Sequence, residues 1–501
     1  MYSVAVYTLG CKLNQVESEA LAAAFRQAGF PLVPWAESAG TPVDILIINT
    51  CTVTSKADQK ARRLIRKALR DNPQSCVVVT GCYAQLEPEA IAALEAPPAI
   101  VDECAGEESA AFTATMPPYR GRRLFVLKGE DKSALLDLPR YLNEAVGIET
   151  AGCNAGPTGS TGLCALMNGW DQSRRTTPQA AAGEGAFRFA PRDFSFHTRG
   201  FLKIQDGCDK FCTYCRVRLA RGPSVSLDAE QILAQLQALE ARGCAEAVLT
   251  GVNITQYRDC GLDSGAGLGA LLEYVLAGTS RISLRLSSLD PDGVDAQFAA
   301  VLANPRIRPH FHLSIQSGSE TILARMGRNY DPQAVVKAAA LFRSVKDDPF
   351  LACDIITGFP GETENEFQKT LALCQNTGFA WIHAFPYSKR PGTPAFSFKE
   401  PVSERDASRR LETLLELARQ GRRNYVQRWV GRETTVLIES GNPSPAGYCR
   451  GTAENYLKLR VLCPTPQAPL PGTVLRCKIG KPADADNEGP DAEAEILSET
   501  L

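Results

Sequence analysis

Hydrophobic residues in the first hundred positions form short continuous runs separated by amphipathic stretches. The runs predict strands at Val4–Leu9, Val43–Asn49 and Cys76–Thr80. The amphipathic stretches predict helices at Glu17–Phe30, Lys56–Arg70 and Pro88–Leu94. Strands that are apolar along their whole length are typical of a parallel sheet covered on both faces. We therefore expect an N-terminal doubly wound parallel-sheet domain of the α/β class over residues 1–105.

A second alternation of strand and helix begins near residue 200. Six apolar runs predict strands at Phe201–Gln205, Ala247–Gly251, Ile282–Ser287, His310–Gln316, Leu351–Thr357 and Trp381–Pro386. Helical patterns lie between them, as at Asp228–Ala241 and Pro332–Val345. Repeated strand–helix units of this length predict a partial (β/α) barrel over residues 196–430.

Two further regions differ in composition. Residues 106–195 contain small-residue-rich stretches at 150–162 and 180–185, which cannot repay ordering entropy by burial, so we expect a linker with a flexible insertion. A folded lid is the alternative interpretation of this segment. Residues 431–501 switch to short apolar runs with Gly and Pro turns, which predicts a small all-β barrel. The last twenty residues carry seven acidic and no basic side chains, and we interpret them as an acidic tail.

Composition narrows the class of protein. The chain has 501 residues, of which 44% are hydrophobic, and a net charge of -2. No apolar run approaches the ~20 residues that span a bilayer, and the N-terminus lacks the pattern of a secretory signal, so we expect a cytoplasmic protein without membrane contact. Seventeen cysteines are unusual in such a chain. Because cytosolic thiols stay reduced, the clustered ones favour metal or redox chemistry over disulfides.

The most specific motif is the loop Cys208-x-x-x-Cys212-x-x-Cys215, directly after the first predicted barrel strand. Three thiolates on one loop can bind three irons of a four-iron cluster and leave the fourth iron open for a small chelating ligand. The alternative is a zinc site or three incidental thiols, but zinc generally takes four ligands. The loop also lies at the carboxyl end of the strands, where active sites of barrels form.

A second trio is spread over the first domain. Cys11, Cys51 and Cys82 each follow a predicted strand, so parallel pairing would bring them to one edge of the sheet. Gly10 and Gly81 would allow close approach to an inorganic ligand. These residues point to a second three-cysteine cluster site. The alternative interpretation is three buried cysteines that pack as small hydrophobic side chains.

The motifs resemble those of radical S-adenosylmethionine enzymes, and of methylthiotransferases in particular. The loop matches the radical enzymes in its CxxxCxxC spacing and in the aromatic Tyr214 before the last cysteine. The methylthiotransferase resemblance rests on residues 8–15, 49–54 and 81–85, continues through the barrel to residues 385–393, and leaves out residues 105–195 and the tail. Within this family, the three N-terminal motifs are most similar to those of the branch that acts on N6-threonylcarbamoyladenosine in tRNA.

This resemblance implies a cytoplasmic transferase with two [4Fe-4S] clusters and S-adenosyl-L-methionine as cofactors. The Cys208 loop would generate a 5′-deoxyadenosyl radical, and the Cys11 trio would carry the sulfur that becomes a methylthio group at C2 of the adenosine next to the anticodon. The expected partners are tRNA, an electron donor such as flavodoxin or ferredoxin, and a sulfur donor, with a monomeric chain. Alternative substrates are isopentenyladenosine in tRNA and an aspartate of a ribosomal protein. A non-catalytic iron–sulfur sensor that binds RNA is the alternative from another class.

Further candidate residues follow from position. Residues at the strand ends of the barrel are expected to contact the cofactor or the substrate, together with Tyr214: Gly251, Ser288, Gln316 and Gly358. The C-terminal module resembles the TRAM domain, a small RNA-binding β-barrel. Basic and aromatic side chains in this module and on two basic helices are expected to bind RNA: Arg63, Arg66, Arg422, Arg423, Arg450 and Tyr456. The sequence assigns no catalytic acid or base.

Overall fold

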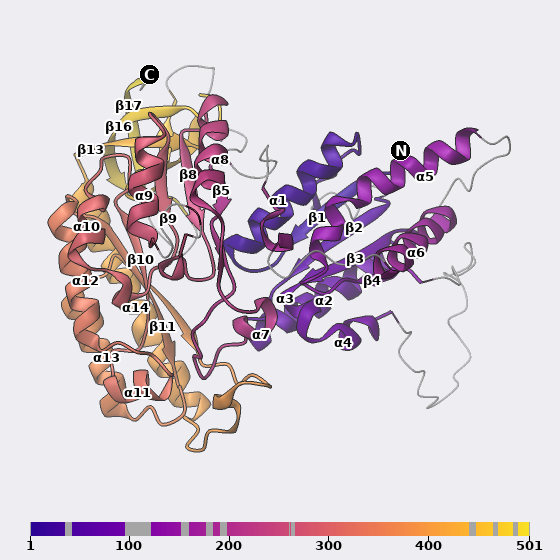
Figure 1. Cartoon of the computed structure of the whole chain (residues 1–501). Helices are drawn as coiled ribbons and strands as arrows, with labels where there is room; N and C mark the ends of the chain where they lie inside the picture. Colours follow the sequence, from indigo (N-terminus) through magenta and orange to yellow (C-terminus); the bar gives the residue numbers. More distant parts are fainter. Residues whose placement is uncertain are drawn as a thin grey trace, which may run out of the picture. The chain divides into compact units, whose positions relative to one another are not determined.

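The computed structural model describes residues 2–35, 43–95, 122–151, 160–176, 184–190, 198–259, 261, 266–439, 447–463, 469–483 and 489–499 (Figure 1). The chain divides into two compact units. The first is Met1–Asp193 with Leu219–Arg221, and the second is Phe194–Arg218 with Gly222–Leu501. Each unit is described by itself below. Within the described residues, no helix combines the length and the apolar character needed to cross a membrane.

The first unit is built on a four-stranded parallel sheet in the order β1-β2-β3-β4. Its strands are β1 (Val4–Thr8), β2 (Ile45–Thr50), β3 (Cys76–Gly81) and β4 (Leu124–Val126). Every residue of β2 and β3 is buried, because both faces of the sheet are covered. The predicted strands and the doubly wound architecture are therefore confirmed.

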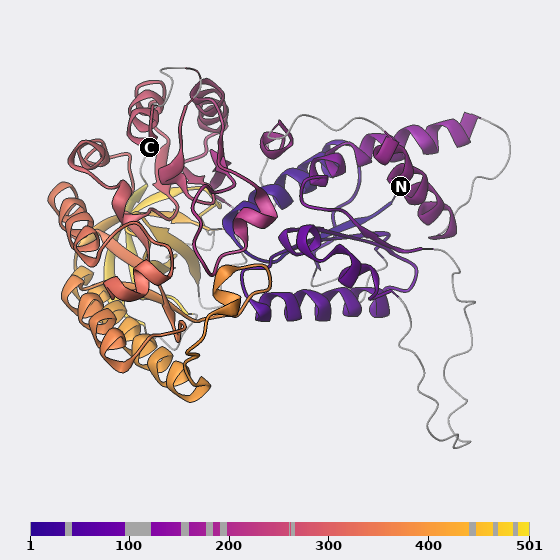
Figure 2. The same cartoon turned by 60° about the horizontal axis from the view of Figure 1, so that its bottom comes forward.

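Helices pack on both faces of this sheet (Figures 1 and 2). One face bears α1 (Lys12–Gln27), α5 (Leu138–Ala151) and α6 (Ser160–Thr176). The other face bears α2 (Ser55–Asp71), α3 (Cys82–Leu86) and α4 (Pro88–Ala92). Successive residues of β2 alternate between the two cores, with Ile45 and Ile47 in one and Leu46 and Ile48 in the other.

The prediction of a flexible linker over residues 106–195 is wrong for its described parts. The strand β4 pairs with β3, and η2 (Lys132–Leu136) leads into α5. Leu142 of α5 and Met167 of α6 are fully buried in the core of the sheet, and η3 (Glu184–Phe187) follows. The segment thus completes the first unit. Residues 152–159 and 177–183, which include most of the small-residue stretches, lie outside the described residues.

The second unit contains the expected partial barrel. Its parallel strands in the described chain are β5 (Gly200–Lys203), β8 (Glu246–Thr250), β9 (Ser283–Leu286), β10 (His310–Gln316), β11 (Phe350–Thr357) and β12 (Trp381–Pro386). They form two sheets, β5-β8-β9 and β10-β11-β12. Parallel bridges from Leu284 to Ile307 and from Leu289 to Leu313 link the two sheets into one open wall. All six predicted strands are present.

Helices and short elements complete this wall. The helices are α8 (Ala229–Ala241), α9 (Leu268–Ala277), α10 (Ala296–Leu302), α11 (Glu320–Arg325), α12 (Pro332–Val345), α13 (Glu364–Thr377) and α14 (Glu404–Trp429). The short helix α7 (Val217–Arg221) is divided between the units, since Leu219–Arg221 belong to the first. Short strands β6 (Gln205–Asp206) and β7 (Val225–Ser226) pair with each other, and the 3-10 helices are η4 (Ile254–Gln256), η5 (Pro291–Gly293) and η6 (Pro394–Ser397).

The C-terminal strands close into a barrel in the order β13-β14-β15-β17-β16. They are β13 (Glu433–Ile438), β14 (Tyr448–Ala453), β15 (Lys458–Leu462), β16 (Val474–Pro482) and β17 (Ala492–Glu499). Its core includes Tyr425 and Trp429 of α14, so this barrel and the β/α wall belong to one compact unit. The interpretation of the last residues as an acidic tail is wrong, because β17 is the strand that closes the barrel, with Ala492 and Ala494 buried inside it.

Candidate functional site

Three cysteines follow three neighbouring strands of the first unit. Cys11 is the N-cap of α1, Cys51 comes directly after β2, and Cys82 begins α3 directly after β3. Because β1, β2 and β3 are adjacent and parallel, their carboxyl ends share one edge of the sheet. The structure therefore brings together three cysteines that are far apart in the sequence.

Two glycines allow the strand ends to approach each other. Gly10 has a φ of +111°, and a Cβ there would lie 2.5 Å from the Cβ of Cys51. Gly81 has a φ of +100°, and a Cβ there would lie 2.3 Å from the backbone oxygen of Thr50. Asn14 holds the same loop, since its Nδ2 donates to that backbone oxygen over 3.0 Å. Only glycine fits both positions without moving a neighbouring loop.

The three thiols also influence one another electrostatically. Burial raises the pKa of Cys51 to about 12, and the neighbouring thiols Cys11 and Cys82 add to this rise. A buried thiol of this kind stays protonated by itself but ionises when a bound metal supplies positive charge. The environment of this trio therefore favours metal ligation over a role as free reactive thiols.

The second trio lies on a single loop of the second unit, after β6. The backbone N–H of Cys215 donates to the backbone oxygen of Cys212 over 3.0 Å, and that of Thr213 donates to the backbone oxygen of Met326 over 2.9 Å. Burial raises the pKa of Cys215 to about 12, with further contributions from Cys212 and Cys208. The loop is thus held by its own turns and by the segment after α11, and its thiols also lie close enough to interact.

A four-iron cluster and a zinc ion make different demands on three cysteine ligands. Among the residues that the structure describes, no group of three or more His, Cys, Asp or Glu side chains is gathered tightly enough to hold one ion. In a cubane cluster each thiolate binds a different iron, so the ligands need not converge on one point as they do around zinc. Ligands spread over one loop or over one sheet edge therefore suit a cluster.

A charged cluster beside the Cys208 loop was not predicted. Nη2 of Arg328 donates to the hydroxyl of Tyr214 over 3.0 Å, and Nη1 lies 3.1 Å from Oδ1 of Asp290. Nζ of Lys210 lies 2.7 Å from Oδ2 of the same carboxylate. The Arg328 guanidinium also interacts with Cys212, so this cluster can stabilise an anionic group on the loop. No sequence signal joins Arg328 to Asp290, which lie 38 positions apart outside any spaced motif.

The residues predicted to contact the cofactor are at the strand ends, as expected, but several have contacts within the protein. A Cβ on Gly251 would lie 2.7 Å from Oε1 of Gln205. Gly358 has a φ of +74° and faces Ala407 of α14. A Cβ added at Gly358 would lie 2.7 Å from the Cβ of Ala407. Gln316 is buried at the end of β10 with a φ of +71°. Close packing by itself explains why glycine stands at positions 251 and 358. Contact of these residues with the cofactor stays a prediction.

The predicted RNA-binding arginines differ in availability. Arg63 and Arg66 are exposed on α2, and Arg450 is exposed on β14. Arg422, in contrast, is held by Asp491, since Nε and Nη2 each donate to a carboxylate oxygen over 2.6 Å. A buried carboxylate thus neutralises the charge of Arg422 in this structure, and phosphate binding by Arg422 stays a prediction.

The last two predicted RNA-binding residues also have partners inside the second unit. Nη2 of Arg423 lies 3.0 Å from Oε1 of Glu416, and both side chains are exposed, so this ion pair is weak. The ring of Tyr456 stacks on His310 with 4.1 Å between centroids, and Nζ of Lys458 lies 4.9 Å from the centroid of the tyrosine ring. Stacking of Tyr456 on a base stays a prediction.

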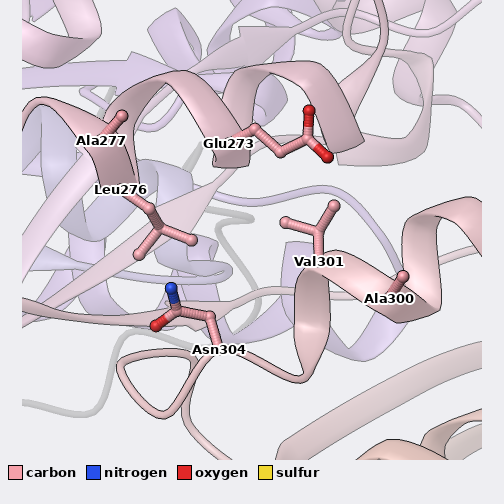
Figure 3. A pocket seen from close by; sticks show the side chains of 6 residues that line it. All are labelled: Glu273, Leu276, Ala277, Ala300, Val301 and Asn304. Carbon is pink, nitrogen blue, oxygen red and sulfur yellow. The ribbon is translucent and has the colours of Figure 1, made fainter.

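A hollow between α9 and α10 lies apart from these residues. Figure 3 shows its lining, which consists of Glu273, Leu276, Ala277, Ala300, Val301 and Asn304. These side chains come from two helices and the turn after α10, and they include no cysteine and no residue of a strand end. The hollow is therefore not part of the candidate site.

Comparison with known families agrees with this architecture. Residues 202–374 match the radical SAM superfamily, and residues 3–102 match uncharacterized protein family UPF0004. The first match covers the Cys208 loop and the strands of the wall as far as β11, and the second covers β1 to β3 with the Cys11 trio. The second unit thus contains a radical SAM domain, and this superfamily implies S-adenosylmethionine and a [4Fe-4S] cluster as cofactors.

Curated relatives narrow the class further. The chain is 41% identical over 477 residues to the threonylcarbamoyladenosine tRNA methylthiotransferase MtaB of Treponema pallidum, covering 92% of this chain and 95% of the relative. The MtaB of Thermotoga maritima is 33% identical, covering 88% of this chain and 87% of the relative. The chain belongs to the MtaB family of tRNA methylthiotransferases. Among solved structures, the radical S-adenosylmethionine methyltransferase TsrM of Kitasatospora setae is 14% identical, with a TM-score of 0.47 and coverage of 79% of this chain and 75% of that chain.

Proposed function

We propose that this protein installs a methylthio group at C2 of N6-threonylcarbamoyladenosine next to the anticodon of tRNA. The observation that carries the proposal is the presence of two cysteine trios, one at the carboxyl ends of three parallel strands and one on the loop after β6, in a chain 41% identical to an MtaB over nearly its whole length. A relative named tRNA-2-methylthio-N(6)-dimethylallyladenosine synthase, from Jannaschia sp., is only 30% identical. The higher identity favours the threonylcarbamoyl substrate.

We assign a second [4Fe-4S] cluster to Cys11, Cys51 and Cys82. The shared sheet edge, the effect of Cys11 and Cys82 on the pKa of Cys51 and the close approach permitted by Gly10 support this assignment. The family resemblance gives this cluster the role of sulfur carrier. A sulfur donor must then replace the sulfur after each product forms.

When bound, the cofactors supply the radical chemistry that a C–H bond on an aromatic ring requires, which side-chain acids and bases cannot supply. The chain's own residues hold and orient the reactants. The guanidinium of Arg328 keeps positive charge beside the Cys208 loop, and its bond to Tyr214 fixes that side chain. Exposed Arg63, Arg66 and Arg450 can contact phosphates of tRNA. An electron donor such as flavodoxin or ferredoxin, a monomeric state and a cytoplasmic location complete the proposal.

Iron content tests the two-cluster assignment. Anaerobically purified protein should contain about eight irons per chain, and Cys11→Ala and Cys208→Ala should each contain about four. A chain with about four irons that loses none of them in Cys11→Ala would contradict the second cluster and leave the first intact.

Mass spectrometry of tRNA nucleosides tests the substrate. A strain without this protein should lose the methylthio form of threonylcarbamoyladenosine and accumulate its precursor. Loss of a methylthio isopentenyladenosine instead, or a mass change only in a ribosomal peptide, would overturn the substrate assignment. An iron–sulfur sensor without catalysis would form no 5′-deoxyadenosine from S-adenosylmethionine under reducing conditions.

A further inference from the structure

The strands β10, β11 and β12 present one face to the helices and the other to the interior of the wall. Phe311 of β10 stacks on Phe342 of α12 with 4.2 Å between centroids, so this face points outward. Because successive side chains alternate, His312 points inward. The register pairs His312 with Ala352 of β11, so residue 354, two positions further along β11, also lies on the inner face, together with its partner His383 of β12.

Two neighbouring rows of side chains on this inner face differ in polarity. The row nearer the strand ends is apolar, with Phe385 of β12 beside Ile356 of β11. Phe385 is 45% exposed, which is unusual for a phenylalanine on the inner face of a sheet. The row two residues earlier is polar, with an exposed His383 beside Asp354.

The polar row continues onto the neighbouring strands through close contacts. Nε2 of His312 lies 3.2 Å from Oδ1 of Asp354, and its Nδ1 lies 2.7 Å from Oγ of Ser288. Nε1 of Trp381 donates to Nδ1 of His383 over 3.2 Å, so the neutral ring of His383 carries its proton on Nε2. The carboxylate of Asp354 thus faces an imidazole, and the histidines are held in defined orientations.

The apolar row is continuous with the Cys208 loop in the same unit. Tyr387 lies two residues, or about 7 Å, beyond Phe385. Its ring packs 5.2 Å from Phe359, which in turn packs 6.4 Å from Tyr214 of the loop. The backbone N–H of Ala395 also donates to the backbone oxygen of Thr213 in that loop, over 2.8 Å. Ile356, the strand partner of Phe385, packs against the same cluster of side chains as Tyr214, so the apolar row extends to the Cys208 loop.

We propose that this inner face binds the target nucleoside, with Phe385 and Ile356 against the adenine ring and His383, His312 and Ser288 against the polar substituent on N6. The inference rests on the proposed function and adds the residues that recognise the substrate. A base that undergoes chemistry must leave its stack, and an exposed aromatic ring replaces the lost stacking. The threonylcarbamoyl group carries a hydroxyl, a urea and a carboxylate, which match imidazole and hydroxyl partners. An isopentenyl group has no polar atom and could form no hydrogen bond with this row.

An RNA-binding experiment tests the base platform. An anticodon stem-loop with threonylcarbamoyladenosine is compared with the same stem-loop carrying an abasic site, using the full-length anaerobic protein. The native protein should lose about 5- to 100-fold in affinity when the base is removed, as stacking energies of this kind imply. Phe385→Leu should lose this discrimination, and Phe385→Tyr, which keeps a ring, should retain it. Equal discrimination in Phe385→Leu and the native protein would overturn the platform.

A second comparison tests the polar row. His383→Leu should bind the unmodified adenosine stem-loop as the native protein does, but it should lose about 10-fold or more of the preference for the threonylcarbamoyl form. Val336→Ala, an exposed position on the outer helix α12, is the matched control and should change neither preference. If His383→Leu kept the native preference for the threonylcarbamoyl form, the proposal that the polar row contacts the N6 substituent would be contradicted. If the native protein bound no stem-loop at all, the proposed function itself would fail.

Discussion

The two cysteine sites are built in opposite ways. The Cys208 loop takes three ligands from eight consecutive positions, held by hydrogen bonds such as Thr213 to Met326. The Cys11 trio takes its ligands from three separate strand ends, so it exists only while β1, β2 and β3 keep their register. One site is therefore a local structure, and the other is a property of a whole sheet.

Because of this difference, the two sites are sensitive to substitutions at different places in the chain. A substitution far from Cys51 that shifts the sheet will separate the ligands of the first trio, whereas the loop depends mainly on its own turns. The glycines show the same contrast. Gly81 fills the space between two strand ends, and Gly207, with a φ of +68°, fills a space within the loop's own base against Pro223. The predictions below separate the two sites by these dependences.

The largest expected effect distinguishes the chemical roles of the sites. Cys215→Ala should reduce 5′-deoxyadenosine formation from S-adenosylmethionine to background, because the open iron is lost with its cluster. Cys51→Ala should keep this cleavage but form no methylthio product. Chromatography of the nucleoside products under anaerobic reduction measures both. Loss of cleavage in both variants would contradict separate roles for the two sites.

A glycine substitution tests the dependence of the first trio on the sheet. Gly81→Ala should destabilise the protein by about 1–3 kcal/mol through its positive φ, with a further cost from the contact at 2.3 Å with the backbone of Thr50. Iron content should fall by about four per chain while cleavage of S-adenosylmethionine continues.

Gly243→Ala is the matched control for this substitution. Gly243 also has a positive φ, +81°, but an added Cβ there would meet no atom within 4 Å. This variant should show the conformational cost and lose no iron. Thermal unfolding and iron analysis together check the pair, and iron loss in Gly243→Ala would contradict the role of close packing at Gly81.

The same difference decides what could be predicted from the sequence. The Cys208 loop is local, so its spacing alone indicates its chemistry. The Cys11 trio became predictable only through the strand pattern that places each cysteine after an apolar run. The helix α6 was missed although Leu163 and Met167 have helical spacing, because the surrounding glycines and small residues dominate the composition. The contact of Arg328 with Asp290 leaves no sequence pattern, since it depends on how distant loops pack.

A smaller effect concerns stability in the second unit alone. Glu246 is buried at the start of β8, with Oε1 2.7 Å from Nε of Arg285 and Oε2 3.1 Å from Nε of Arg308. Burial by itself would raise the pKa of this carboxyl, but the arginines outweigh it and lower the pKa to about 2. The folded pKa lies below the unfolded value of about 4.5, so ionised Glu246 stabilises the fold above pH 4.5, by about 3 kcal/mol, and the contribution is lost as the pH falls through about 2.

Glu246→Gln tests this account. The variant should unfold at lower denaturant concentration at pH 7, because it leaves buried arginines without their carboxylate. It should also lose part of the dependence of stability on pH between about 4.5 and 2. The iron content of the Cys11 trio, in the other unit, should not change. Equal stability of Glu246→Gln and the native protein at pH 7 would contradict the account.

The smallest effect compares two arginines that looked equivalent in the sequence. Arg66 is exposed on α2, so Arg66→Ala should weaken the binding of different tRNAs to the same extent. It should also lower the slope of log affinity against log salt concentration by the amount expected for the loss of about one phosphate contact. Arg422 is held by the buried Asp491, so Arg422→Ala should leave that slope unchanged and instead destabilise the C-terminal barrel. Salt titrations of tRNA binding and thermal unfolding measure the two quantities. A reduced slope in Arg422→Ala would show that the ion pair opens for RNA, because only a freed guanidinium can release a counterion from the phosphate backbone.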